Sequence, residues 1–422
     1  MNIKIIAIFA VIVVVVAGIG AVLMMNGSET YRSDDDTGRL MVYGNANNDD
    51  YLDNDDIKAL EDIINGDMEK TPLSDANQDG VVDKADIEWV KRMVNREKMD
   101  IYYQYSFSGE RTVKTVSYPL SRIVLVGVDI TVTLKAIGGE NKIVGMHGGA
   151  LDDVLFSDLK GIPKISSSLT TADLELVSQH NVDAIITHDT QVCVPNESMF
   201  VAAGIDVIRI ATSDAESLAG VLTVGYFLQR EDQSHEYVRF CDEIVKELEN
   251  KVGAGKIKDS DRKTAFNVVM TNSLSGTIST YYAATELAGA KNLADWNTTT
   301  RNFPLGDEWL FESKYDADYI IHMRSMGYGS VDKQNIWNTY SIYFADTNTY
   351  NDGNYVIVNL DMPICLRLAY MASIFYPDIF GEDWGDKKNQ EFVDRFTKNL
   401  SDRDYDVVSD GTFFIKANMV NS

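Results

Sequence analysis

Basic side chains and cysteine are scarce in this sequence. Against 64 acidic residues there are 38 lysines and arginines, which gives a formal net charge of −26 at pH 7. Nucleic acids and anionic membrane surfaces are therefore poor partners, because they attract an excess of positive charge. The three cysteines, Cys193, Cys241 and Cys365, are far apart and lie in or near apolar stretches. They form no metal-binding spacing, and we expect them to be buried thiols.

Catalytic signatures are missing as well. The sequence contains no G-x-S-x-G elbow, no phosphate-binding glycine loop and no HExxH metal motif. We therefore expect a protein that is not an enzyme. With 422 residues the chain is too long for one compact core, so two or three domains are expected.

One long uncharged run stands near the start of the chain. Residues 5–25 are 21 residues without a charge, which at helical rise match the roughly 30 Å hydrocarbon core of a bilayer. Lys4 precedes the run and acidic residues follow it, so we expect residues 1–28 to be a single-pass anchor in the cell membrane, with the soluble part outside. No cysteine follows the run, which excludes a lipid anchor. Cleavage of the segment is the alternative.

Two acidic loops have the residue spacing of calcium-binding loops. Residues 75–86 read DANQDGVVDKAD, with oxygen-bearing side chains at loop positions 1, 3, 5, 9 and 12 and glycine at position 6. Calcium takes roughly six to eight oxygen ligands, and this spacing turns them toward one point. The predicted ligands are Asp75, Asn77, Asp79, Asp83 and Asp86, with the carbonyl of Val81. At the same positions, residues 45–56 hold Asn45, Asn47, Asp49, Asp53 and Asp56, with the carbonyl of Tyr51.

The repeat continues into the segments that follow the loops. Ile57, Leu60 and Ile64 are matched by Ile87, Val90 and Val94, each pair 30 residues apart. Residues 40–98 resemble a dockerin domain, a small all-α, calcium-folded module of extracellular assemblies. The resemblance implies two calcium ions and a cohesin-domain partner. The second loop matches better, because Asn45 and Asp50 replace the usual acidic residue and glycine of the first. A calcium-stiffened spacer or tether is the alternative.

From residue 116 the sequence alternates between strand-like and helix-like segments. The predicted strands cover residues 122–126, 142–145, 183–187 and 206–210, and then 265–271, 318–322 and 355–360. Such alternation indicates parallel sheets with covering helices, so we expect an α/β fold of two Rossmann-like lobes, residues 116–213 and 253–416. The apolar spacing in residues 214–252 predicts a single long helix that joins the lobes beside a cleft.

The order of these segments resembles a family of binding proteins. RIV at 122–124, IGGENKIVG at 137–145, NVDAIIT at 181–187 and AAGIDVI at 202–208 precede the linking helix. This order is similar to the class III periplasmic binding proteins of ABC importers. The resemblance implies a ferric siderophore, haem or cobalamin-type ligand, and a permease with its ATPase as partners. The glutamates that meet the permease in this family match Glu175 and Glu308. A cell-surface scaffold or adhesion protein that uses the dockerin-like module is the alternative.

Histidines occupy positions where open parallel sheets present side chains to ligands. His147 and His188 follow predicted strands, and His322 ends one. Imidazole is a common metal ligand, and methionine can be an axial haem ligand. We therefore expect these histidines and Met146 to contact a metal-containing ligand, such as an iron chelate, haem or a corrinoid.

Three further residues belong to this predicted site. Arg324 would face carboxylates of the ligand, while Tyr281 and Tyr282 would stack on a flat ring. A free metal ion held by the three histidines and a carboxylate such as Asp361 is the alternative.

Overall fold

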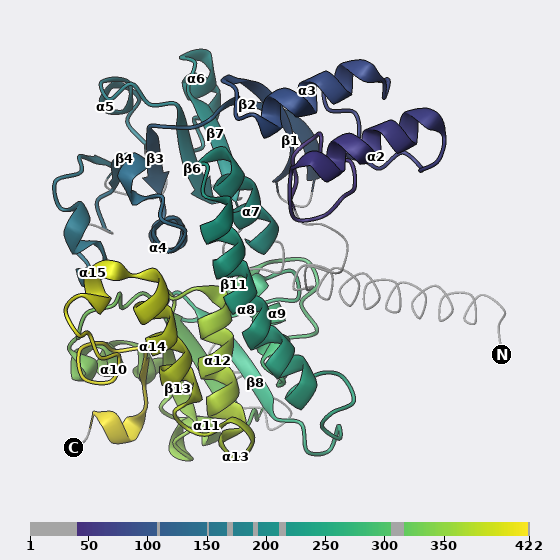
Figure 1. The fold of residues 1–422 in the computed structure, drawn as a ribbon. Coiled ribbons are helices and arrows are strands. Elements are labelled where there is room, and N and C mark those ends of the chain that lie inside the picture. Colours follow the sequence, from purple (N-terminus) through teal and green to yellow (C-terminus); the bar gives the residue numbers. More distant parts are fainter. Residues whose placement is uncertain are drawn as a thin grey trace, which may run out of the picture.

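The computed structural model describes residues 40–107, 110–149, 152–166, 172–188, 193–210, 217–304 and 316–420. Two α/β lobes lie next to each other along a long helix, and a small helical module projects to one side of the N-terminal lobe (Figure 1). The predicted membrane segment at residues 1–28 lies outside the described residues. Within the described ranges, no helix is long and apolar enough to cross a bilayer.

A parallel sheet forms the centre of the N-terminal lobe. Its strands are β3 (Ile123–Val126), β4 (Ile143–His147), β5 (Lys164–Ser166), β6 (Ala184–His188) and β7 (Asp206–Ile210). They lie in the order β5-β4-β3-β6-β7, and every neighbouring pair is parallel. The connecting helices are α4 (Val128–Ala136), η1 (Glu140–Lys142), η2 (Val154–Leu159), α5 (Leu174–Ser178) and α6 (Glu197–Ala202). The strands predicted for this lobe are confirmed, and only β5 was not foreseen.

The C-terminal lobe has a mixed sheet. Its strands are β8 (Thr264–Val269), β9 (Ser273–Ser275), β10 (Lys291–Asn292), β11 (Asn302–Pro304), β12 (Tyr319–Arg324), β13 (Tyr355–Asn359) and β14 (Phe414–Ile415). The three predicted strands, β8, β12 and β13, are confirmed as a parallel centre. Antiparallel strands flank it, with β9 and β11 beyond β8 and with β14 beside β13. The Rossmann-like arrangement expected for this lobe is therefore present in its parallel centre, and antiparallel strands are added at the edges of the sheet.

Helices cover this second sheet. They are α9 (Thr280–Leu287), α10 (Lys333–Ser341), η5 (Ile342–Phe344), α11 (Asn348–Asn351), α12 (Ile364–Phe375), α13 (Pro377–Phe380), α14 (Trp384–Phe396), α15 (Lys398–Ser401) and η6 (Ala417–Met419). The helix α12 is buried along its whole length. It therefore reads as an apolar run rather than as an amphipathic stripe.

The linking segment is two helices instead of one. The first, α7 (Ser217–Phe227), ends before Gln229, whose φ of +53° lies in the left-handed region. The second, α8 (Glu231–Val252), is the long helix of Figure 1. A left-handed residue cannot continue a right-handed helix, so the chain turns at this point.

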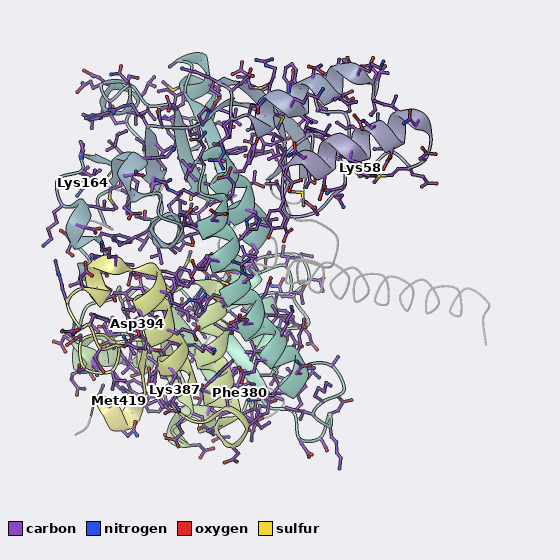
Figure 2. The ribbon with its side chains drawn as sticks, in the orientation of Figure 1. Lys58, Lys164, Phe380, Lys387, Asp394 and Met419 are labelled. Carbon is purple, nitrogen blue, oxygen red and sulfur yellow. The ribbon has the colours of Figure 1, made fainter. Side chains whose placement is uncertain are left out.

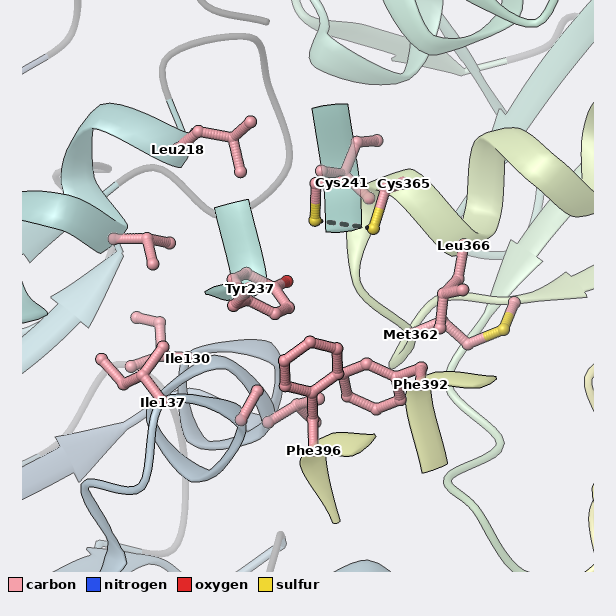
Figure 3. Close-up of a cluster of buried hydrophobic side chains, with 14 of the residues drawn as sticks. Ile130, Ile137, Leu218, Tyr237, Cys241, Met362, Cys365, Leu366, Phe392 and Phe396 are labelled. Atoms are coloured by element: carbon pink, nitrogen blue, oxygen red, sulfur yellow. Dashed lines mark hydrogen bonds between the residues drawn. The ribbon is translucent and has the colours of Figure 1, made fainter. Parts of the chain in front are cut away.

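The apolar face of α8 lies in a core shared by both lobes (Figure 3). Tyr237 packs edge-on against Phe396 of α14, with 5.6 Å between the ring centroids. Ile130 of α4 belongs to the same cluster on the N-terminal side. The cysteines are buried, as predicted, and the Sγ atoms of Cys241 and Cys365 are 2.9 Å apart. Because the core is continuous, α8 packs against both lobes along one apolar stripe.

The two repeated segments form helices α2 (Asn54–Asn65) and α3 (Lys84–Val94). Each helix begins with the reciprocal side-chain and backbone hydrogen bonds of a capping box. Figure 2 shows Lys58 on α2, in the part of the molecule that projects from the lobes. We call residues 40–98 the repeat module.

A hairpin that was not predicted joins the repeat module to the lobes. It consists of β1 (Met99–Phe107) and β2 (Glu110–Tyr118), paired antiparallel. Ile101, Tyr103 and Tyr105 alternate along β1 and are buried. The ring of Tyr103 packs edge-on against Phe227, with 5.1 Å between centroids. The hairpin therefore packs on α7 through a hydrophobic contact.

Candidate functional site: the interlobe cluster and the acidic loops

The N-terminal sheet has a topological switch point between β3 and β6, because β4 and β5 are added on one side of β3 and β6 and β7 on the other. Ligands of open parallel sheets bind beyond the carboxyl ends of the strands at such points. Asp129 lies there in the first turn of α4, and His188 ends β6. The Asp129 Oδ1 and His188 Nε2 atoms are 3.0 Å apart. The strand-end position predicted for His188 is thus confirmed, whereas Asp129 was not predicted.

The corresponding switch point of the C-terminal sheet lies between β8 and β12. The carbonyl oxygen of Met270, just after β8, is 2.6 Å from His322 Nε2 and accepts a hydrogen bond from Arg324 Nη1 at 2.8 Å. The other ring nitrogen of His322 is 2.7 Å from the Tyr355 hydroxyl. Burial lowers the pKa of His322 from 6.5 to about 4, so the ring is neutral at physiological pH.

This arrangement corrects the role predicted for His322. The side chain is fully buried, and both ring nitrogens are engaged in hydrogen bonds within the lobe. It supports the backbone around Arg324 instead of facing a ligand. Arg324 is partly exposed at the end of β12, where its guanidinium lies 4.0 Å from the centroid of the Tyr340 ring and donates to the Tyr340 hydroxyl at 2.7 Å.

Polar groups of the C-terminal lobe also interact with one another. Arg367 of α12 is 1% exposed, and its guanidinium lies 6.0 Å from the centroid of the Tyr281 ring. Burial raises the pKa of the Tyr281 hydroxyl, and the positive charge of Arg367 opposes that shift. Asp361 follows β13 and accepts hydrogen bonds from the Ser325 hydroxyl at 2.6 Å and the Gly327 amide at 2.8 Å.

The acidic groups of both lobes act on one another across the gap. Burial raises the pKa of Asp361, and the carboxylate of Asp129 in the opposite lobe raises it further. Burial also raises the pKa of Asp153, and Asp361 again adds to the shift. Asp129, Asp153, Asp361, Tyr281 and Arg367 therefore form one polar set, which we call the interlobe cluster.

The lobes are in direct contact beside this cluster. The carboxylate of Asp153 accepts a hydrogen bond from the Tyr328 amide at 2.7 Å. A Cβ atom at Gly327, where φ is +66°, would come within 1.8 Å of the same carboxylate, so glycine is required there. The side-chain amide of Asn399 donates to the Leu155 carbonyl at 2.9 Å. These contacts fix the loop between β4 and β5 on the C-terminal lobe.

Other predicted ligand residues are not brought into the interlobe cluster. Met146 is fully buried in the hydrophobic core. Tyr282 packs against the apolar cluster of the C-terminal sheet, and its charged neighbours are Glu286, Asp295 and Arg262. His147 is half-buried at the end of β4, and its ring lies next to Gly149. Throughout the described part of the chain, no three His, Cys, Asp or Glu side chains converge as a metal site.

A hollow of about 400 Å³ lies elsewhere between the lobes. It is lined mainly by charged and polar side chains, including Lys135, Glu236 and Arg395. Lys135 is at the carboxyl end of α4, the opposite end from Asp129, and pairs with Asp158 at 2.6 Å. The hollow is therefore separate from the strand ends.

Of the two predicted permease contacts, Glu175 lies in the described part of the chain and Glu308 does not. Glu175 is exposed in the first turn of α5, whose N-terminus is capped by the Asp173 side chain. Such an exposed position on the outer side of a lobe is available to a partner. Glu308 lies outside the described residues.

The acidic loops of the repeat module share a set of hydrogen bonds. In the first, the Asp56 carboxylate accepts from the backbone amides of Asn47 and Asp53 at 3.3 and 2.9 Å. In the second, the Asp86 carboxylate accepts from the equivalent amides at 3.2 and 2.9 Å. The sequence repeat is therefore a structural repeat as well.

The second loop contains a buried carboxylate, although its acidic side chains, which lie within the described residues 40–107, do not converge in the geometry of a metal site. Asp75 is buried, and among the described residues its Oδ1 atom has no hydrogen-bond partner. Burial raises the pKa of Asp86, and the nearby charge of Asp75 adds to the shift. Buried carboxylates that repel each other favour a cation between them. The oxygens of Asn77 and Asp79 and the carbonyl of Val81 belong to the same loop and complete the donor types that calcium prefers.

Structural comparison identifies the class of fold. The chain is similar to the TroA-like periplasmic binding protein FepB from Veillonella parvula, with 19% identity, a TM-score of 0.55, and coverage of 74% of this chain and 99% of that one. It is also similar to a periplasmic haem-binding protein from Pseudomonas aeruginosa, with 19% identity, a TM-score of 0.51, and coverage of 62% of this chain and 94% of that one. For the molybdate-bound MolA of Haemophilus influenzae, the identity is 15% and the TM-score 0.55, with coverage of 68% of this chain and 95% of that one.

The chain thus has the two-lobed fold of TroA-like periplasmic binding proteins, and the predicted resemblance to that class is confirmed for the fold. These neighbours are described as binding proteins. No known family profile or curated protein sequence matches the chain.

Two residues of the interlobe cluster have sequence features from which they could have been predicted. Arg367 stands in the apolar run ICLRLAYMASIF, where a lone charge indicates a buried, partnered group. Asp129 follows the strand IVLV by three residues, the same strand-end position that singled out the histidines. Asp153 had no local signal, because its partner Tyr328 is 175 residues away.

Proposed function

We propose that the protein is an extracytoplasmic solute-binding protein that delivers its ligand to the permease and ATPase of an ABC importer. The interlobe cluster carries this proposal. Its members come from loops and from the first turns of helices in both lobes, so a ligand between the lobes would contact both. A two-lobed fold without a catalytic constellation among the sequence motifs supports binding over catalysis.

The ligand class that fits these side chains is a metal chelate with anionic groups: an iron chelate, haem or a corrinoid. Arg367 next to the Tyr281 ring combines a cation for carboxylates with an aromatic face for a planar group. A free metal ion held by the three histidines, the alternative from sequence, has less support, because both ring nitrogens of His322 already have hydrogen-bond partners within the lobe.

A binding titration tests this function. The full chain is titrated with haemin, cyanocobalamin, a ferric catecholate and a ferric hydroxamate, and tryptophan fluorescence and calorimetry report binding. We expect one of these probes to bind with 1:1 stoichiometry. Tyr281→Phe and Asp129→Asn should weaken that binding, whereas Glu236→Gln, in the separate hollow, should leave it unchanged. If Glu236→Gln alone alters affinity, the interlobe cluster is not the site.

Docking to the permease is proposed through Glu175 and Glu308. Glu175 supports this by its exposure on α5. In cells, charge reversal of both residues to lysine should lower uptake of the bound probe without changing its affinity in solution. The exposed Glu61 on α2 gives a matched control, and Glu61→Lys should transport normally. Normal uptake by the double variant would exclude this docking mode.

We also propose that the repeat module binds calcium through its second loop, because Asp75 has a buried carboxylate oxygen without a partner. Asp75→Ala should abolish calorimetric calcium binding at this loop in the full chain, and the exposed Asp67→Ala should not. Unchanged binding in Asp75→Ala would remove the assignment.

The module's partner and the membrane anchor are further proposals. A cohesin domain would bind the calcium-loaded module, and residues 1–28 would hold the protein in the membrane. Carbonate extraction of membranes tests the second point, since a retained anchor stays in the pellet. A cell-surface scaffold role would be supported by cohesin binding without any binding of the four probes.

A further inference from the structure

The two loops of the repeat module differ at their sixth position. In the second loop Gly80 has a φ of +94°, and its amide donates to the Asp75 carboxylate at 2.9 Å. In the first loop the sixth residue is Asp50, which is not among the described residues with positive φ. The fourth residues, Asn48 and Gln78, do match, with φ of +57° and +59°. The first loop therefore begins with the same turn and then departs from it.

The residues at the first position of the two loops also differ in their hydrogen bonds. Asn45 is fully buried, and its side-chain amide donates to the carbonyls of Leu40 at 2.9 Å and Asp49 at 2.7 Å. Its side-chain oxygen accepts from the Asp49 amide at 3.1 Å. An amide carries no charge, and both ends of this one are already hydrogen-bonded. Asp75, by contrast, keeps a buried oxygen without a partner.

What the first loop contacts is the linking helix. The carbonyl oxygen of Asp50 is 2.8 Å from His235 Nε2 on α8. The ring of Tyr51 stacks on the His235 imidazole, with 4.1 Å between centroids and 18° between planes. Asp50 and His235 are 5% and 6% exposed, so the contact between them is buried, whereas Tyr51 is 37% exposed. Hydrogen bonds in such places resist opening.

We infer that the first loop is a metal-independent joint that fixes the repeat module to α8, and that only the second loop takes a calcium ion. The second half of this inference rests on the proposed calcium function. His235 is then a positioning residue, because it holds the backbone of the first loop in a shape that does not depend on a cation. Arg96 of the module and Glu231 at the start of α8 are 3.3 Å apart beside this joint and add a second contact.

Two measurements on the full chain test the joint: calcium stoichiometry by native mass spectrometry, and hydrogen exchange with calcium or chelator. We expect one calcium ion per chain, lost in Asp75→Ala and kept in Asn45→Ala. Exchange in residues 45–56 should be the same with calcium and with chelator, whereas exchange in residues 75–86 should slow when calcium is added.

His235→Ala separates the joint from general folding. It should speed exchange in residues 45–56 by roughly two- to tenfold, the effect of losing one buried hydrogen bond, without altering calcium stoichiometry. The matched control is His180→Ala in the N-terminal lobe, which should leave residues 45–56 unchanged. Two calcium ions per chain, or exchange in residues 45–56 that slows only with calcium, would overturn the inference. Absence of calcium from the wild type would refute the calcium proposal, and the His235→Ala result would still decide the joint.

Discussion

His322 illustrates how a correctly located residue can have a different role from the predicted one. Its place in β12 follows from the sequence, although the strand continues to Arg324 instead of ending at His322 as predicted. Its orientation does not, since alternate side chains of a strand covered on both faces are all buried. Only the folded chain brings the Tyr355 hydroxyl and the Met270 carbonyl to the two ring nitrogens. The same limit applies to Met146.

The lowered pKa of His322 predicts a pH-dependent stability. The folded value is about 4 against an ordinary 6.5, so between these values the unfolded chain binds a proton that the folded chain does not. Stability from this group is complete above pH 6.5 and is lost as the pH falls to 4, by about 3 kcal/mol in total. Urea unfolding at pH 7 and pH 4.5 measures this loss. His322→Gln should show a smaller decrease, and identical decreases in the two proteins would contradict the prediction.

At the scale of elements, α8 was predictable because its apolar residues repeat at helical spacing and are all buried. The break before it was not, because α7 is apolar on every side and offers no periodicity to interrupt. The β1–β2 hairpin could have been found, since Ile101, Tyr103 and Tyr105 alternate with more polar residues. The antiparallel strands β9, β11 and β14 are too short, at two or three residues, to carry a pattern.

The packing of α14 on α8 predicts a large effect at Phe392. This ring is fully buried. Its centroid lies 6.3 Å from that of Phe240 and 6.4 Å from that of Tyr237, both on α8. Phe392→Ala should lower the free energy of unfolding by about 3–5 kcal/mol, because the helices cannot close the cavity. Val408→Ala, at a side chain that is 68% exposed, should change it by less than about 0.5 kcal/mol. Urea unfolding followed by circular dichroism makes the comparison, and similar values for the two variants would contradict this account of the core.

At the scale of the whole molecule, the two lobes and their connection followed from the order of strands and helices. The sheet order and the mixed edges of the second sheet did not, because hydrophobic patterns do not state which strands are neighbours. The interlobe cluster as a whole was harder to predict from the sequence. Asp129 and Asp361 belong to different lobes and act on each other only once the lobes are packed. A site of this kind is created by tertiary structure, so no local motif marks it.

The repeat module shows the same dependence on tertiary structure. Its loops and helices could be predicted from spacing alone, but the contact of Asp50 with His235 spans 185 residues. Through that contact and the hairpin, the module lies against the N-terminal lobe. A tether or partner bound to the module would therefore hold the lobes in a fixed orientation.

The central claim is that a solute binds between the lobes, in contact with both. Hydrogen exchange of the full chain tests it most directly, measured with and without the tightest binder among haemin, cyanocobalamin, a ferric catecholate and a ferric hydroxamate. The account predicts that binding slows exchange in residues 127–131 of one lobe and 360–367 of the other at the same ligand concentration. Slowing confined to one lobe, slowing only around the hollow at Lys135 and Glu236, or no binding of any of the four would contradict it.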